Sequence, residues 1–166
     1  MKKIKLIQYA ESEIDNYIDV VIEQFSVALA KTGIQDAAVI AENKVIGEFF
    51  PGRKPNDKQF VFHIQDVDTG TQVGWIWLAD RGNTELRVAD LHIHEVNRGL
   101  EYGAASMIVA EQFAIDKGFL TISLNVFDEN VVAKKMYERL GYKVIEEGNG
   151  RSEMHKVIIE IPDTFS

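Results

Sequence analysis

The chain has 166 residues, 46% of them hydrophobic, which is enough for one well-buried core. Its formal net charge of -8 predicts a surface that repels nucleic acid and anionic membranes. The absence of cysteine excludes disulfides, zinc–thiolate sites and a cysteine nucleophile. No stretch is long or apolar enough to span a membrane, and the first residues lack the apolar run of a signal peptide. We therefore expect a single domain, residues 1–166, in a cytoplasmic protein.

The first part of the chain predicts a short strand and two helices. Residues 5–8 resemble a strand, and from residue 12 apolar side chains recur every three or four positions, which is typical of a helix. Gly33 is a suitable end for that helix, and a second helix is expected over residues 36–49. Two prolines and a glycine in residues 51–57 (PGRKPND) then interrupt regular structure.

A hairpin, a third strand and a helix are expected next. Residues 59–65 and 72–79 are strand-like and are joined by the turn sequence DVDTGT. Residues 85–94 (ELRVADLHIH) form a third strand of this group. A turn follows, and the next helix is expected over residues 103–117, with Gly118 at its C-terminal end.

The last part of the chain predicts a strand, a helix and a final hairpin. Residues 119–127 alternate apolar and polar side chains as a strand does, and Asn130 is a good N-cap for a helix that ends at Leu140. The final two strands are expected at residues 142–147 and 154–161. The side chains of the helix that we expect in the core are Val132, Met136 and Leu140.

The turn at residues 96–106 (VNRGLEYGAAS) has several features of a phosphate site. The start of a helix offers free backbone N–H groups and the positive end of the helix dipole. Gly99 and Gly103 allow close approach of the backbone to a ligand, and Arg98 can hold two phosphate oxygens at once. The P-loop ending and the three glycines of the dinucleotide fingerprint are both absent. The turn by itself is therefore also compatible with an ordinary strand–helix junction.

Two motifs together resemble the GNAT family of N-acetyltransferases. The first family pattern is Gln/Arg-x-x-Gly-x-Gly/Ala after the fourth strand; here Arg98 and Gly103 match it and Glu101 replaces the central glycine. The second is a strand followed by Asn-x-x-Ala-x-x-x-Tyr-x-x-x-Gly-Tyr/Phe, which resembles NVFDENVVAKKMYERLGYKV. The matching positions are Asn130, Ala133, Tyr137, Gly141 and Tyr142. The resemblance covers residues 85–146, and the first half of the chain is similar to the family only in the order of its elements.

The resemblance implies a fold class and an activity. The fold would be α/β in the mixed α+β sense: the acyl-CoA N-acyltransferase fold, a central mixed, mostly antiparallel twisted sheet with helices on both faces. The activity would be transfer of an acetyl group from acetyl-coenzyme A to a primary amine, by direct attack in a ternary complex and without a metal. The acceptor would be a small molecule or a peptide. Two alternatives are a weakened GNAT-like domain that binds acyl-coenzyme A or a partner, and transfer of a longer acyl group. Because family members are often dimers, a homodimer is also compatible with the resemblance.

The resemblance also assigns residues to the coenzyme. Main-chain groups of Leu91 and Ile93 would pair with the pantetheine arm where the fourth and fifth strands separate, and Asn130 would bond the arm from the other side. Arg98 would lead the loop that receives the pyrophosphate. The backbone N–H groups of the loop itself would come from Gly99, Leu100, Glu101, Tyr102, Gly103 and Ala104.

The resemblance places Tyr137 near the thioester sulfur, as the general acid that protonates the leaving thiolate. The reaction also needs a base for the ammonium group of the acceptor. The candidates on the fourth strand are Glu85, Asp90, His92 and His94. His92 and Asp90 are closest to the strand separation and are both favoured, without a choice between them. His92 and His94 share a strand face, but no third ligand is identifiable, so we expect no metal.

Glu101 is the unusual residue of the turn, and its cost depends on where its carboxylate points. A positive φ at this position costs a residue other than glycine about 1–2 kcal/mol. A carboxylate about 5 Å from a phosphate would add repulsion of about 3 kcal/mol at an effective dielectric near 20, but under about 1 kcal/mol in water. The backbone N–H groups of the turn can still donate to a phosphate whichever residue stands at position 101. We expect Glu101 to point outward, towards solvent.

Overall fold

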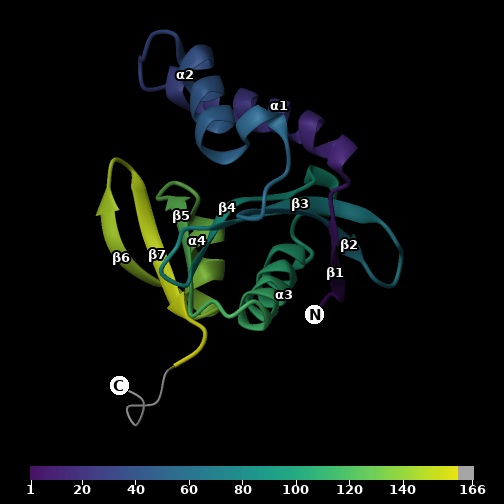
Figure 1. Ribbon diagram of the computed structural model, residues 1–166. Helices are drawn as coiled ribbons and strands as arrows, with labels where there is room; N and C mark the ends of the chain where they lie inside the picture. The colour runs from purple at the N-terminus through teal and green to yellow at the C-terminus, as the bar shows by residue number, and fades with distance from the viewer. Residues whose placement is uncertain (161–166) are drawn as a thin grey trace. The chain divides into compact units, whose positions relative to one another are not determined.

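In the computed structural model, residues 1–160 are described, and they divide into two compact units (Figure 1). One unit consists of Gln8–Val61, and the other of Met1–Ile7 together with the chain from Phe62 onwards. The single domain expected from the sequence remains a prediction. Among residues 1–160, no helix is both long and apolar enough to cross a membrane.

The first unit is mainly helical. It contains α1 (Glu11–Ala30) and α2 (Ala37–Lys44), and α2 continues into a π-helical turn at Val45–Phe49. The helix expected over residues 36–49 is therefore present but changes its hydrogen-bonding pattern in its last turn. Arg53, in the segment PGRKPND, bonds the carboxylates of Asp15 and Asp19 in α1, each at 2.6 Å.

The sheet has seven strands in the order β1-β2-β3-β4-β5-β7-β6. The strands are β1 (Ile4–Gln8), β2 (Gln59–Asp66), β3 (Gln72–Asp80), β4 (Glu85–Ile93), β5 (Thr121–Phe127), β6 (Lys143–Gly148) and β7 (Arg151–Val157). The β4–β5 pair is parallel, whereas β3–β4, β5–β7 and β6–β7 are antiparallel. The predicted mixed, mostly antiparallel sheet flanked by helices is confirmed.

The final hairpin is tighter than the sequence predicts. β7 begins at Arg151, three positions before the expected start at Met154, and it ends at Val157. Asn149 and Gly150, both with positive φ, form the turn. The sequence did not indicate this earlier start, because residues 151–153 are polar. They pair with β6, which is an exposed edge strand. Its predicted end, residue 161, lies outside the described residues.

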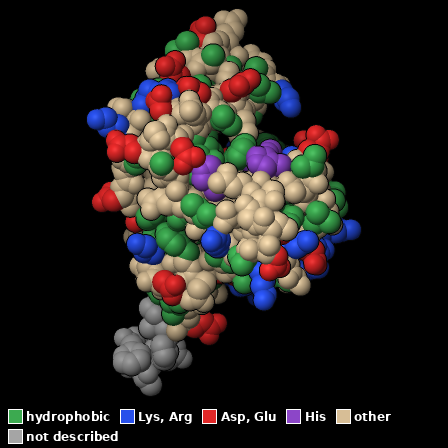
Figure 2. Space-filling view, turned by 90° about the vertical axis from the view of Figure 1, so that its right-hand side faces the viewer, with side chains coloured by type: hydrophobic (Ala, Val, Ile, Leu, Met, Phe, Trp, Pro, Cys, Tyr) green, Lys and Arg blue, Asp and Glu red, His purple; other side chains and the backbone are tan. Residues whose placement is uncertain are grey.

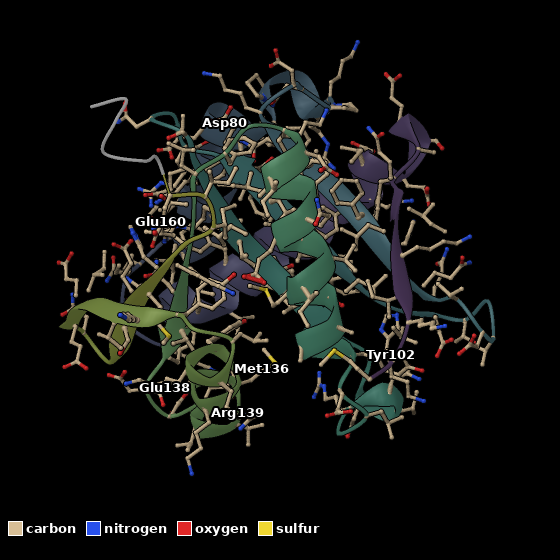
Figure 3. All side chains as sticks on the ribbon, turned by 90° about the horizontal axis from the view of Figure 1, so that it is seen from below. Asp80, Tyr102, Met136, Glu138, Arg139 and Glu160 are labelled. Atoms are coloured by element: carbon tan, nitrogen blue, oxygen red, sulfur yellow. The ribbon has the colours of Figure 1, made fainter. Side chains whose placement is uncertain are left out.

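Helices α3 (Tyr102–Asp116) and α4 (Val131–Arg139) lie on the same face of the sheet (Figures 1 and 3). α3 is rich in alanine, so it can pack closely against the apolar side chains of the central strands. The fully buried residues of this core include Ile76, Leu78, Leu86, Met107, Ala110, Ile122, Leu124 and Met154.

α4 contributes little to the core. Its only buried residue is Tyr137. Val132, expected in the core, is 81% exposed, and Met136 and Leu140 are half-buried. The prediction for Val132 is therefore wrong: its position on the nine-residue helix faces solvent, and the apolar pattern of so short a helix did not determine its buried face.

Candidate active site

The site is centred on a gap between two neighbouring strands of the sheet. In β4, only residues Glu85–Val88 pair with β5, where their partners are Thr121–Leu124. The rest of β4, up to Ile93, has no pairing with β5. The separation begins next to a β-bulge: Trp77 pairs with Asp90 but Leu78 pairs with Val88, so Ala89 is an extra residue in β4. The bulge bends the strand where the gap opens.

The main-chain groups of Leu91 and Ile93 face this gap. His94 N donates to Val73 O of β3 at 2.8 Å, and residues of an antiparallel strand turn alternately to one neighbour and the other. Leu91 and Ile93 therefore point away from β3. The carbonyl of Ile93 accepts a hydrogen bond from Arg98 Nε at 2.9 Å, so the arginine expected at the phosphate loop also covers part of the strand edge.

Trp75, Asp90, His92 and His94 form a cluster on one face of β3 and β4. The indole Nε1 of Trp75 donates to Asp90 Oδ2 at 2.7 Å. The rings of Trp75 and His92 are stacked with their centres 4.1 Å apart, and His94 meets both rings edge-on. Figure 2 shows histidine side chains at the surface among hydrophobic and acidic ones. The structure thus brings together both favoured base candidates.

His92 is suited to accept a proton near neutral pH. Partial burial lowers the pKa of His92 below its usual 6.5, and the positive charge of His94 acts in the same direction, against the opposing effect of Asp90. A lowered pKa leaves the imidazole neutral at pH 7.

The other two candidates are placed differently. His94 shares the cluster, whereas Glu85 lies in a separate polar group in which its carboxylate accepts from Ser123 Oγ at 2.9 Å and pairs with Arg81 at 3.4 Å. Among residues 1–160, no three His, Asp or Glu side chains are grouped as metal ligands would be.

Tyr137, in α4, is 8% exposed. Burial raises the pKa of Tyr137 to about 12, and the negative charge of Asp90 contributes to the increase. The phenol is therefore protonated at neutral pH and able to donate. Asn130 caps α4 as predicted, because its Oδ1 accepts from Ala133 N at 3.2 Å. Its amide N–H groups, which the cap does not use, have no acceptor among the described side chains and backbone.

The turn before α3 presents a row of backbone donors. After a short 3-10 helix at Glu95–Asn97, Gly99 has φ of 76° and Glu101 has φ of 68°. Within the described part of the chain, no N–H from Gly99 to Ala104 donates a hydrogen bond; the next donor is Ala105 N, to Glu101 O at 3.1 Å. Such a set of oriented donors fits a pyrophosphate.

Glu101 is the N-cap of α3 in the left-handed region, and its side chain is exposed. The strain expected from a positive φ is therefore present, whereas the carboxylate faces solvent. Because the side chain makes no hydrogen bond or ion pair with any described residue, it does not stabilise the turn.

We expect Glu101→Gly to relieve backbone strain with little effect on coenzyme binding. Removing the left-handed cost of about 1–2 kcal/mol is partly offset by the flexibility of glycine in the unfolded chain, about 0.5–1 kcal/mol. Chemical denaturation should therefore show a gain in stability of up to about 1.5 kcal/mol. Calorimetry should show less than about fivefold tighter binding of coenzyme A, because repulsion across water is weak. Tightening far above that factor would mean that the carboxylate faces the phosphates.

A buried carboxylate ties this turn to the β2–β3 hairpin. Tyr102, the first residue of α3, donates its hydroxyl to Asp66 Oδ2 at 2.5 Å, and Asp66 is 3% exposed. The other oxygen, Oδ1, accepts from Asp68 N at 2.8 Å and Thr69 N at 3.1 Å. The sequence did not reveal this link, because an aspartate in DVDTGT is equally typical of an ordinary turn.

We expect Tyr102→Phe to weaken coenzyme A binding several-fold and to make the protein more sensitive to acid. The hydrogen bond from Tyr102 lowers the pKa of Asp66 below its usual 3.8. Such a carboxylate stabilises the fold above its usual pKa, and this contribution is lost as pH falls through the lowered value. The variant should therefore unfold at higher pH in an acid titration followed by circular dichroism. Asp68→Asn is the control, and an equal shift in that exposed neighbour would contradict the assignment to Tyr102.

The chain is similar to known proteins both in sequence and in fold. The sequence pattern described as the acetyltransferase (GNAT) family matches residues 35–142. The chain is 23% identical over 147 residues to the uncharacterized N-acetyltransferase YycN of Bacillus subtilis (strain 168), covering 84% of this chain and 92% of that protein.

Two crystal structures show the same fold. That of YycN from Bacillus subtilis superposes with a TM-score of 0.75 at 21% identity, covering 88% of this chain and 96% of that one. The structure of the PaiA N-acetyltransferase from Thermoplasma acidophilum, in complex with coenzyme A, superposes with a TM-score of 0.65 at 18% identity. The match covers 93% of this chain and 99% of that one. Because the family pattern covers more than half of the residues, this chain belongs to the acetyltransferase (GNAT) family.

Proposed function

We propose that the protein transfers an acetyl group from acetyl-coenzyme A to a primary amine. The observation that carries the proposal is the gap beside β4, which has main-chain groups of Leu91 and Ile93 on its edge. The unpaired N–H groups of Gly99–Ala104 stand at the turn that follows, and Tyr137 and His92 supply an acid and a base. The complex of PaiA with coenzyme A supports a coenzyme of this kind in this fold.

In the proposed site, acetyl-coenzyme A supplies the acyl group as a thioester. His92 removes one proton from the acceptor ammonium and later releases it to solvent, and the neutral nitrogen forms a bond to the thioester carbon. As the carbon–sulfur bond breaks, the nitrogen loses its second proton to solvent. Tyr137 gives its phenol proton to the leaving sulfur and recovers one from solvent. Holding both substrates in the gap removes most of the entropic cost of their encounter.

The contacts of Asp90 favour His92 as the base. Asp90 Oδ2 already accepts the indole N–H of Trp75, and a carboxylate engaged in this way is held in one orientation. Its negative charge lies near both His92 and Tyr137. We therefore assign Asp90 a positioning role: it holds Trp75, on which the imidazole of His92 stacks.

A panel of amines, assayed by release of free thiol from acetyl-coenzyme A, tests the proposal. The panel should include polyamines, amino acids and peptide N-termini, because the sequence does not determine the acceptor. Turnover with at least one amine is expected. No binding of acetyl-coenzyme A at millimolar concentration would contradict the proposal. Binding without thiol release would favour the alternative of a weakened acyl-coenzyme A-binding domain, and competition among acyl-coenzymes tests longer acyl groups.

The pH dependence identifies the base. The rate constant kcat/KM should rise with pH through the pKa of His92, which lies below 6.5, because only the neutral imidazole accepts a proton. His92→Gln should lower kcat/KM about 100-fold and remove this limb of the profile. Asp90→Asn should lower kcat/KM by a smaller factor, and kcat/KM should still rise with pH through the pKa of His92. If His92→Gln leaves the acid limb in place, the base is a different group.

A further inference from the structure

α4 needs a support that its own packing does not provide. Tyr137 is the only buried residue in α4, and Val131 and Val132 are exposed apolar residues. Figure 3 shows Glu138 and Arg139 pointing away from α3. In the second half of α4, Met136 approaches the first turn of α3, with its Sδ 3.2 Å from where a Cβ on Gly103 would lie. Apolar burial alone therefore fixes the position of Tyr137 weakly.

An ion pair with a buried carboxylate and a half-buried ammonium joins α3 to β7. Glu111 of α3 is 8% exposed, and its Oε1 pairs with Nζ of Lys156 in β7. Lys156 is opposite Ile122 in β5, so the pair joins α3 to β7 where that strand pairs with β5. The sequence motifs gave no sign of it, because a glutamate in α3 and a lysine in the last strand are ordinary surface residues in a sequence.

Tyr142 connects this ion pair to Tyr137. The ammonium of Lys156 lies 5.7 Å from the centre of the Tyr142 ring, and Tyr142 is 2% exposed. The rings of Tyr142 and Tyr137 meet edge to face with their centres 5.9 Å apart. The backbone N–H of Tyr142 also donates to Tyr137 O at 3.0 Å. The stem of Lys156 lies 3.5 Å from where a Cβ on Gly141 would stand.

We propose that the Glu111–Lys156 ion pair is a positioning device for Tyr137, acting through the ring of Tyr142. The pair holds Tyr142 in place, and Tyr142 sets where the phenol of Tyr137 stands beside the gap between β4 and β5. This inference rests on the proposed function, in which Tyr137 is the general acid.

A partly buried ion pair is poor evidence for a role in stability alone. Well-packed apolar residues often replace such a pair without loss, because both charges no longer have to be desolvated. The charges do, however, fix a geometry, since an ammonium seeks one place against a carboxylate and a ring face. Replacing both charges therefore separates positioning from stability.

The test is the double variant Glu111→Leu/Lys156→Met, assayed with the best amine of the panel. We expect an unchanged melting temperature, an unchanged KM for acetyl-coenzyme A and about a tenfold lower kcat. In a Tyr137→Phe background the same two substitutions should have no further effect, because the group that they position is gone. The single variant Lys156→Arg, which keeps the positive charge opposite Glu111, should retain most of the wild-type kcat. Lys117→Met is the matched control. The Lys117 ammonium also lies near an aromatic ring, 5.8 Å from the centre of the Phe113 ring, but outside the proposed site.

A kcat equal to wild type in the double variant would overturn the inference, and so would an equal loss in the Tyr137→Phe background. If the double variant does not fold, Tyr142→Leu serves instead, with the same expected fall in kcat, and a normal kcat overturns the inference.

A second readout needs no acceptor. The ring signals of Tyr137 can be followed at neutral pH by NMR of ring-labelled tyrosine, with Tyr137→Phe for assignment. Loss of the ion pair should shift these signals, because the ring of Tyr142, 5.9 Å away, is no longer held in place. If wild type releases no thiol with any amine, the proposed function fails, while this shift still decides the inference: ring signals unchanged from wild type overturn it.

Discussion

Replacing Tyr137 by phenylalanine should lower kcat about 100-fold while KM for acetyl-coenzyme A changes little. The substitution removes one hydroxyl and keeps the buried ring, so the fold and the edge-to-face contact with Tyr142 are retained. General acid catalysis contributes about 10²–10⁴-fold, and we expect the lower end because a thiolate is a stable leaving group. Steady-state kinetics with free-thiol detection measures the effect.

The matched control for Tyr137→Phe is Glu138→Gln. Glu138 is the next residue of α4 and is exposed, so its substitution should leave kcat and the melting temperature unchanged. Coenzyme A binding should be the same in both variants by calorimetry. Full turnover by Tyr137→Phe would mean that the departing thiolate takes its proton from solvent or from another group.

Gly74→Ala should cause the largest loss of stability among the variants considered. A Cβ on Gly74 would lie 1.9 Å from the carbonyl oxygen of His92 and 3.0 Å from the Cα of Ile93. Both are backbone atoms, so no side-chain rotation relieves the overlap, and β3 and β4 must move apart. Overpacking of a core typically costs about 1–3 kcal/mol, and we expect at least the upper value here. For a chain of this size this is a fall in melting temperature of about 6–12 °C.

The same substitution should lower activity beyond what unfolding explains. Gly74 pairs with Ile93, and the displaced atoms belong to His92 and Ile93, which carry the proposed base and the edge of the gap. A shift of about 1 Å at a reacting group can cost 100-fold in rate. Gly148→Ala is the control, since a Cβ on this strand glycine meets nothing within 4 Å. Wild-type stability and kcat in Gly74→Ala would show that the strands adjust without cost.

Much of the second half of the chain was predictable because its signals are local. Alternating apolar residues indicated the strands from Gln59 to Ile93, and Asn130 marked the start of α4 through its capping bond. The strand glycine at Gly74 could have been noticed, since such a residue often marks a close approach of two backbones. The edge of the last hairpin was less predictable, because every residue of β6 is exposed and the first three residues of β7 are polar.

The sequence by itself determined the family and the residue types of the site, because two motifs at a fixed separation specify a turn, a helix start and a tyrosine. Only the tertiary structure decided how these groups meet. The bulge at Ala89 reverses the alternation of β4, so Glu85 and His92 lie on the same sheet face although their numbers differ in parity. The contacts Tyr102–Asp66 and Lys156–Glu111 each join elements far apart in the chain, and Trp75–Asp90 depends on the register of two neighbouring strands. Such pairs follow from strand register and helix packing, which no local pattern contains.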